Sequence, residues 1–156
     1  MDRAVNMVQA ALSVETAAFA ARRRRRDIAR GAPGDAAGRG AAVEVAMARR
    51  VSKATVDHQL AFAESLVDDL PQLLQACLAG RVSQAAARFA VKACEPLDHD
   101  QRRAVDAELA RLAGELTPGE FRKAADRLVA ATDPAAAEKR AALARARKAV
   151  RAIMHW

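Results

Sequence analysis

The chain has 156 residues and a formal net charge of +7, and hydrophobic residue types make up 52% of it although only 3% of the residues are aromatic. This length suits one domain with a real core and is too short for two. Alanine, the strongest helix former, occupies 42 positions. Since β-branched and aromatic runs are almost absent, the composition favours helices and argues against a sheet.

Membrane and secretion signals are also missing from the sequence. No uninterrupted apolar stretch approaches the roughly twenty residues that cross a membrane, and the arginines near the N-terminus follow the apolar residues instead of preceding them, unlike in a signal peptide. We therefore expect a cytoplasmic protein without membrane contact. Cys77 and Cys94 lie beside apolar residues in predicted helices, so we expect buried free thiols and neither a disulfide nor a zinc site.

The positive charge is concentrated at the two ends of the chain. Residues 1–40 hold eight Lys/Arg against four Asp/Glu, and residues 134–156 hold six against one. The middle, residues 41–133, is slightly acidic, with twelve against fourteen. Basic ends suit an anionic partner such as nucleic acid or an acidic protein surface. The alternative is a solvated, arginine-rich surface without such a partner.

The predicted elements begin with a helix over residues 2–28. Four large apolar residues recur on one face of it at helical spacing: Val5, Val8, Leu12 and Phe19. The helix runs into the five consecutive arginines Arg22–Arg26, which surround a helix and so cannot all face the core. Glycines and Pro33 then predict a break. We thus expect a basic N-terminal helix over residues 1–30, a flexible loop over 31–40 and a helical domain over 41–156.

The helical domain is predicted to start with a short helix over residues 41–49 that contains Val43 and Met47 on one side. Ser52 is a good N-cap for the next helix, which ends near Pro71. That helix carries an apolar stripe at a period of 3.6 residues, made of Val56, Leu60, Ala63, Val67 and Leu70. A further helix stops at Gly80, and Ser83 caps the one after it, which we expect to bury Phe89, Ala90 and Cys94.

Three helix-start signals follow in the last third of the chain. Asp98 with Gln101 resembles a capping box ahead of the apolar positions Val105, Leu109 and Leu112. Residues 117–120, Thr-Pro-Gly-Glu, combine a cap, a proline at the first helical position and the matching glutamate. Asp133 and Pro134 open a last helix over residues 134–151. The sequence therefore predicts an all-α fold, a single multi-helix domain of about eight helices.

Two segments of the chain, residues 50–54 and 81–85, echo each other and read as helix-turn-helix-like hairpins. The first hairpin, residues 43–56, has the small Ala46 and the apolar Val51 and Val56 where a DNA-reading helix-turn-helix needs them. Its second helix would present Ser52, Lys53, Thr55, His58 and Gln59 to bases or phosphates. Against DNA reading, Arg50 replaces the usual turn glycine, and four acidic residues follow: Asp57, Glu64, Asp68 and Asp69. Hairpins of this shape also serve simply as packing units.

The basic ends are the better candidates for contact with duplex phosphate, because the chain has too few aromatics for single-strand stacking. With the hairpin, the candidate DNA-binding residues are Arg22, Arg23, Arg24, Arg25, Arg26, Arg49, Arg50, Ser52, Lys53, Thr55, Lys139, Arg140, Arg145, Arg147, Lys148 and Arg151. No catalytic constellation accompanies them, since His58, His99 and His155 are scattered and no phosphate loop or nucleophile elbow occurs. We expect no metal, no cofactor and no small-molecule substrate.

From about Ala41 to Ile153 the sequence resembles the actinobacterial domain of unknown function 222. Its motifs recur in order as residues 44–52, 70–74, 79–83, 97–98, 116–120 and 133–134. The resemblance implies that this chain corresponds to the helical region that precedes a C-terminal HNH nuclease in such proteins. That nuclease is a metal-dependent module that cleaves DNA. The histidine pair and cysteines of that module do not occur in this chain, so we expect no enzyme activity.

Two functional hypotheses follow from the sequence. In the first, the chain is a non-catalytic, DNA-associated helical module that binds duplex phosphate through its basic ends and positions a nuclease. In the second, it is a helical protein–protein module that forms a homodimer or docks a nuclease, which the acidic middle and the shortage of large core residues favour. A truncated, non-functional remnant is the third possibility.

Overall fold

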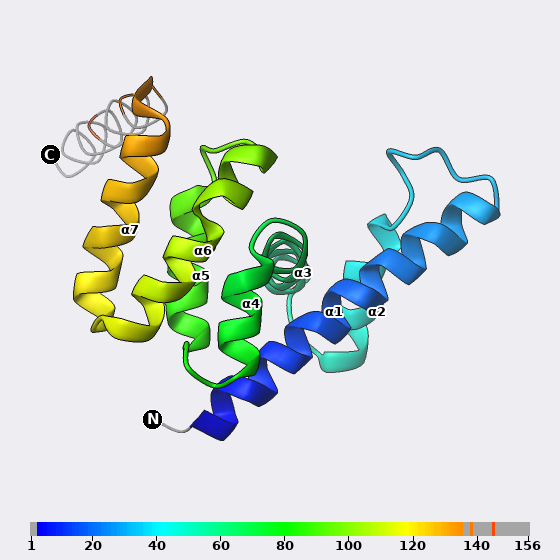
Figure 1. The fold of residues 1–156 in the computed structure, drawn as a ribbon. Helices are drawn as coiled ribbons and strands as arrows, with labels where there is room; N and C mark the ends of the chain where they lie inside the picture. Colours follow the sequence, from blue (N-terminus) through cyan, green and yellow to red (C-terminus); the bar gives the residue numbers. More distant parts are fainter. Residues whose placement is uncertain (1–2, 136–137, 139–144, 146–156) are drawn as a thin grey trace, which may run out of the picture.

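The computed structural model describes residues 3–135, 138 and 145, and over these residues the fold is all-helical (Figure 1). This confirms the predicted all-α class. Seven helices span the described residues, and much of the eighth predicted helix, residues 134–151, lies outside them. The helices are α1 (Arg3–Ala29), α2 (Arg39–Arg49), α3 (Lys53–Asp68), α4 (Pro71–Leu78), α5 (Gln84–Cys94), α6 (His99–Glu115) and α7 (Pro118–Thr132).

The main core lies among α4, α5, α6, α7 and the second half of α3. Its largest fully buried side chains include Leu66, Leu73, Leu109 and Phe121. Alanines fill most of the space between these anchors, and helices separated by small side chains can approach closely. Both cysteines are buried and neither forms a disulfide, as the sequence predicts.

Helix α1 lies across this body and packs on α3, α4 and α5 through a face of small residues: Ala10, Ser13, Ala17 and Ala20. At its first turn the Arg3 guanidinium donates to the carbonyl of Ala79 at 2.9 Å. The face of α1 that carries the large apolar residues is not the face that packs on the body of the protein. Val5, Val8 and Leu12 are 39%, 69% and 55% exposed, because the alanine face allows closer packing than these larger side chains would.

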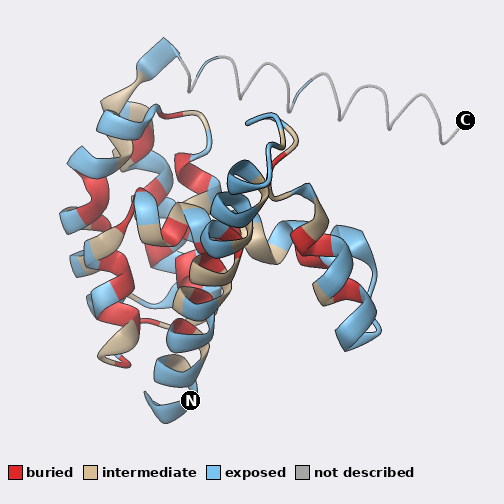
Figure 2. Cartoon of the chain, turned by 90° about the vertical axis from the view of Figure 1, so that its right-hand side faces the viewer, coloured by how far each residue is buried: buried red, intermediate tan, exposed pale blue. Residues whose placement is uncertain are grey.

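Helix α2 returns alongside the second half of α1 and packs on α3, where Ala42, Ala46 and Val56 form a second, smaller core. Figure 2 shows the buried residues concentrated in the body of the molecule and mostly exposed residues along α1. The end of α1 and the start of α2 therefore extend the molecule away from its main core (Figure 1).

The predicted caps at the starts of α3, α5, α6 and α7 are confirmed. The hydroxyls of Ser52 and Ser83 accept the backbone N–H groups of Thr55 and Ala86, at 3.1 and 3.2 Å. Complete capping boxes begin α6, at Asp98 and Gln101, and α7, at Thr117 and Glu120. These signals are local in sequence, and each satisfies N–H groups that a helix start leaves unpaired.

The expected burial of Phe89 is wrong, although Ala90 and Cys94 are buried as predicted. Phe89 is 37% exposed, and the Arg122 guanidinium of α7 lies over its ring at 5.1 Å from the centroid. The hydrophobic side of this ring is thus covered by a cation from the neighbouring helix.

Among the described residues, α1 is also the one helix that is long and apolar enough to cross a membrane by length and composition. We expected none from the sequence. Of the apolar window 22% is buried in the fold, and the same test is passed by core helices of soluble proteins, which are mostly buried, and by signal sequences near an N-terminus.

Candidate functional site

The arginine run of α1 divides into side chains that face the protein and side chains that face solvent. Arg23 is half-buried, whereas Arg22, Arg25 and Arg26 are exposed and form no ion pair with any residue that the structure describes. Residues three and four apart share one face of a helix, so these three guanidiniums project together. The exposed Arg30 follows Arg26 by four residues, just beyond the end of α1.

Arg23 belongs to a clamp that joins α1 to the start of α2. Its Nε lies 3.0 Å from the carboxylate of Asp27, and its guanidinium also pairs with Glu44 of α2. The second carboxylate oxygen of Asp27 accepts the backbone N–H of Gly38 at 2.9 Å. The Gly38 N–H first, and then Arg23, favour the charged carboxylate and so lower the pKa of Asp27, although partial burial opposes them.

Gly38 allows this clamp to form. Its φ of +87° lies in the left-handed region, and a Cβ at this position would lie 3.4 Å from the Cβ of Arg24. The glycine thereby lets the chain turn into α2 directly against α1.

The hairpin of α2 and α3 has the predicted turn with one difference in packing. Ala46 and Val56 are buried as expected, whereas Val51 is 38% exposed. The backbone N–H of Val51 bonds to the carbonyl of Ala46 at 3.1 Å, and that of Arg50 to the carbonyl of Met47 at 3.4 Å, which is a Schellman motif. Arg50 has a φ of +54°, the one positive value at a non-glycine residue in the described chain.

The polar candidates of this hairpin are exposed, and most are engaged by neighbours within it. Ser52 caps α3 and also shares a hydrogen bond with the Thr55 hydroxyl at 2.8 Å. Lys53 pairs with Asp57 at 2.7 Å, and Arg49 donates to the side chain of Gln59 at 2.9 Å. Contact with DNA would have to compete with these interactions.

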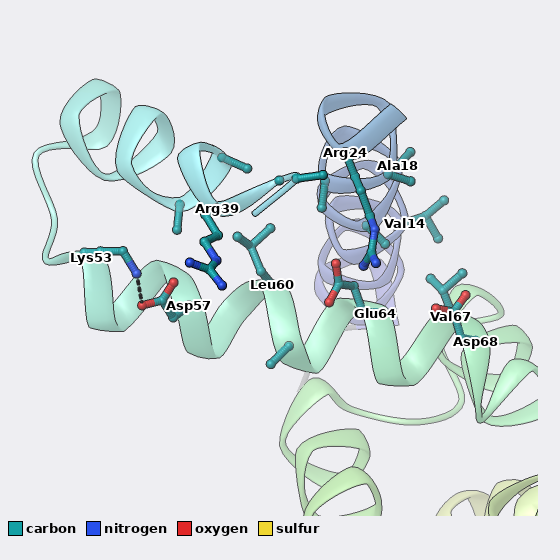
Figure 3. A pocket seen from close by; sticks show the side chains of 18 residues that line it. Val14, Ala18, Arg24, Arg39, Lys53, Asp57, Leu60, Glu64, Val67 and Asp68 are labelled. Carbon is teal, nitrogen blue, oxygen red and sulfur yellow. Dashed lines mark hydrogen bonds and ion pairs between the residues drawn. The ribbon is translucent and has the colours of Figure 1, made fainter. Parts of the chain in front are cut away.

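A groove of about 780 Å³ lies among α1, α2 and α3 (Figure 3). Its floor is small and apolar, with Ala17, Ala20, Ala41 and Ala42 buried beneath it. Acidic residues of α3 line one wall, namely Asp57, Glu64 and Asp68, and Arg24 and Arg39 stand opposite. Partial burial and then the charge of Asp68 raise the pKa of Glu64, and Arg24 opposes this shift.

Of the remaining candidates, Arg24 faces the groove, where Figure 3 shows its guanidinium above Glu64. In the C-terminal group the structure describes only Arg145, which is exposed. The others lie outside the described residues: Lys139, Arg140, Arg147, Lys148 and Arg151.

A second polar cluster joins the ends of three helices. Nothing in the sequence pointed to it. The carboxylate of Asp69 lies 2.8 Å from Nδ1 of His99 and 2.7 Å from the guanidinium of Arg102. Arg102 also donates to the carbonyls of Cys94 and Glu95 at the end of α5, each at 3.1 Å. These bonds satisfy carbonyls that the end of a helix leaves unpaired, so the cluster has a structural explanation. Among the described residues, no three His, Cys, Asp or Glu side chains gather as metal ligands.

A family model described as Domain of unknown function (DUF222) matches residues 3–153. The match includes α1, whereas the motifs of the sequence carry the resemblance only from about residue 41. No curated protein and no solved structure matches the chain. Since the family model covers nearly all of the sequence, the chain belongs to the DUF222 family.

Proposed function

We propose that the chain is a DNA-associated helical module that binds duplex phosphate through the exposed arginines of α1. One observation carries this proposal: Arg22, Arg25 and Arg26 share a solvent face and have no carboxylate partner among the described residues. Guanidinium groups donate charge-assisted hydrogen bonds to phosphate, and neutralising phosphates releases bound counterions. An unpaired arginine can make this contact without first breaking an ion pair.

The clamp around Arg23 supports the same proposal. It ties the arginine-bearing end of α1 to α2 through Asp27, Glu44 and Gly38. A row of cations on a fixed helix loses less conformational freedom on binding than the same cations on a loose tail. Arg23 would thus act by positioning its neighbours.

The hairpin of α2 and α3 is a weaker candidate for the main contact surface. Lys53 is neutralised by Asp57, and the acidic side chains Glu64 and Asp68 follow along α3. Phosphate would be repelled along that helix. We propose that Arg49, Arg50, Ser52 and Thr55 contribute at most a secondary contact.

The resemblance to the helical region of HNH endonuclease proteins suggests what such binding would achieve. In such proteins a separate module would cleave DNA. This helical module would hold the duplex near it and supply no catalytic group.

A protein–protein role is the second candidate, and the exposed apolar stripe of α1 favours it. Val5, Val8 and Leu12 follow one another at helical spacing on the solvent side of the helix. Large aliphatic side chains in such a row are typical of a surface that packs on another helix.

Fluorescence anisotropy with a labelled duplex tests the proposal. Replacing Arg22, Arg25 and Arg26 by Gln keeps good helix propensity and removes three charges, and we expect binding to weaken roughly tenfold or more. The matched control replaces the exposed Arg81, Lys123 and Arg127 by Gln, which changes the net charge equally elsewhere. Equal losses in both variants, or no binding of the unaltered chain at low salt, would refute the proposal.

A further inference from the structure

The exposed side of α1 carries two surfaces, one after the other along the helix. Its first half holds the apolar stripe, which consists of Val5, Val8 and Leu12. Its second half holds what we call the arginine face, which consists of Arg22, Arg25 and Arg26. Glu15 is the one charged residue between the two sets. The first half of α1 therefore presents aliphatic side chains to solvent and the second half presents cations.

The two surfaces point in different directions around the axis of α1. At about 100° per residue, the mean direction of the arginine face lies roughly 80° to one side of the apolar stripe. The packing face, Ala10, Ser13, Ala17 and Ala20, lies roughly 130° to the other side of the stripe. The arginine face is thus turned away from the protein body, and it lies beside anything that packs on the apolar stripe.

We infer that the apolar stripe packs on the apolar stripe of a second copy, with the two α1 helices antiparallel, and that this pair presents both arginine faces to one duplex. The duplex contact in this inference rests on the proposed function. A second copy is favoured because an isologous pair matches the aliphatic stripe with itself. The antiparallel direction is favoured because a parallel pair would bring the arginine faces together, where like charges repel.

The antiparallel arrangement sets the distance between the two arginine faces. With the two-fold axis midway between Val8 and Leu12, Arg22 lies twelve residues from the axis and Arg26 lies sixteen. At a rise of about 1.5 Å per residue, equivalent arginines of the two copies are about 36 Å to about 48 Å apart along the helices. Since one turn of duplex measures about 34–36 Å, the two faces would meet phosphates about one turn apart.

Two-fold symmetry also places the two arginine faces on the same side of the pair. The axis runs between the helices, perpendicular to both, so a side chain displaced to one side of the stripe is displaced to that side in both copies. The packing face and the residues that hold α2, Arg23 and Asp27, lie toward the other side. A duplex along the pair would therefore reach both arginine faces on the side away from the protein bodies.

The contact between the stripes is small, so the duplex should strengthen it. The facing segments, residues 5–15 of each copy, form a strip about 16 Å long and about 10 Å wide. A stable interface buries about 800 Å² on each partner, which is several times more. Dimerisation of the free chain should therefore be weak, and two copies on one duplex should associate more readily because binding raises their effective concentration.

Light scattering during size exclusion, over a series of protein concentrations, tests the α1 contact. Replacing Val8 and Leu12 by Gln keeps the charge and good helix propensity, and should raise the dimer dissociation constant about tenfold or more. The matched control replaces Val43 and Met47 of α2 by Gln, which are 42% and 76% exposed, and should leave the dimer intact. Circular dichroism should show unchanged helix content in both variants. A monomer at every concentration, with and without duplex, or a dimer that survives the α1 changes, would overturn the inference.

Two duplex lengths separate the dimer from the phosphate contact. A hairpin duplex of about 8 base pairs is about 27 Å long and can meet one arginine face, whereas about 24 base pairs can meet both. The unaltered chain should bind the long duplex cooperatively, and about tenfold or more tightly than the short one. The Val8 and Leu12 variant should bind the short duplex as the unaltered chain does and lose cooperativity on the long one.

The two parts of the account fail in different ways. Equal cooperativity in the unaltered chain and the Val8 and Leu12 variant would overturn the inference and leave the phosphate contact standing. Failure of the unaltered chain to bind either duplex would refute the DNA role, and the light-scattering result alone would then decide the α1 contact.

Discussion

Arg50 and Gly80 hold the same position in two turns, each being the left-handed residue that ends the first helix of a hairpin. Their φ values are +54° and +73°. After Gly80 the N–H of Arg81 bonds to the carbonyl of Ala76 at 3.0 Å, as Val51 bonds to Ala46 after Arg50. The two Arg-Val-Ser segments nevertheless differ in the distance along the chain from the left-handed residue to the capping serine. Arg50 precedes its capping serine by two residues and Gly80 precedes its own by three.

Arg50→Gly should stabilise the fold. A non-glycine residue in the left-handed region destabilises the folded state by about 1–2 kcal/mol. Glycine removes this strain, but it also makes the unfolded chain more flexible, which offsets about 0.4–1 kcal/mol of the gain. We expect the free energy of unfolding, measured in urea, to rise by about 0.5–1 kcal/mol. An unchanged or lower value would mean that the Arg50 side chain makes a compensating contact.

Gly80→Ala should have the opposite effect. A Cβ at Gly80 would lie 2.3 Å from Cγ of Arg3 and 2.8 Å from its carbonyl oxygen, so the first turn of α1 would have to move. With the left-handed strain added, we expect a loss of about 2 kcal/mol in the free energy of unfolding. Gly114→Ala is the control, because no atom lies within 4 Å of its Cβ position in α6 and its φ is not positive. It should gain roughly 0.5–1 kcal/mol.

Asp106 should be essential to the packing of α4. This buried carboxylate of α6 accepts the N–H groups of Gln72 and Leu73 at 2.7 and 2.9 Å, at a helix start whose N-cap, Leu70, has no side-chain acceptor. Asp106→Ala leaves both N–H groups without that acceptor and should cost about 3 kcal/mol in urea unfolding. Asp106→Asn keeps one acceptor oxygen and should lose less.

The pH dependence of this contribution has a definite sign. Burial is the main influence on the pKa of Asp106 and raises it, against the two N–H donors and Arg103. The contribution of protonated Asp106 to the free energy of unfolding is therefore fully present below the ordinary pKa near 3.8. It is lost as pH rises through the raised pKa of the folded state. Urea unfolding from about pH 3.5 to about pH 6.5 should show the free energy of unfolding of the unaltered chain falling relative to that of Asp106→Asn. The same pH slope in Asp106→Asn would contradict the assignment to Asp106.

Breaking the Arg23 clamp should loosen α2 and leave the main core unchanged. In Arg23→Gln, hydrogen exchange should quicken in α2 and in the turn at Gly38, because the links to Asp27 and Glu44 are lost. Arg22→Gln removes the same charge from an exposed side chain and serves as the control. Hydrogen exchange in α2 at the same rate in both variants would show that the clamp does not hold α2 against α1.

The same clamp should weaken in acid. Since the folded-state pKa of Asp27 is lowered, its contribution is present above its ordinary value near 3.8 and is lost as pH falls through the lower folded value. Exchange in α2 should therefore quicken at low pH, after correction for the intrinsic rate, and Asp27→Asn should abolish the change.

The cysteines should be unreactive in the native protein. Burial raises the pKa of the Cys77 thiol to about 11, and Cys94 is also buried. Because the thiolate is the reactive form, a disulfide-exchange reagent near neutral pH should label neither residue in buffer and both in denaturant. Rapid labelling of the native chain would show that the core between α4 and α5 opens.

Features that depend on neighbours in sequence could be predicted, and features that depend on distant partners could not. Ser52 and Ser83 were recognisable as caps because each bonds to an N–H three residues ahead. In α1 large apolar residues such as Val8 mark one face in the sequence, and the structure shows that alanines form the packing face. Tertiary packing buried the alanine face because it fits closely against α3.

The same difference between local and distant partners applies to the residues of the candidate site. Five adjacent arginines look alike in sequence, and only the fold distinguishes Arg23, whose partner Glu44 lies twenty-one residues away. Asp27, four residues after Arg23, was the one local signal of the clamp. Asp106 looked like an ordinary helix-surface acid because the N–H groups it accepts belong to another helix.

The salt dependence of duplex binding tests the central claim most directly. For the unaltered chain, the logarithm of the binding constant should fall linearly with the logarithm of salt concentration, by about 0.9 per phosphate neutralised. Replacing Arg22, Arg25 and Arg26 by Gln should reduce that slope by about 3, whereas the Arg81, Lys123 and Arg127 control should leave it unchanged. A slope that is the same in all three proteins would contradict phosphate binding by the exposed arginines of α1.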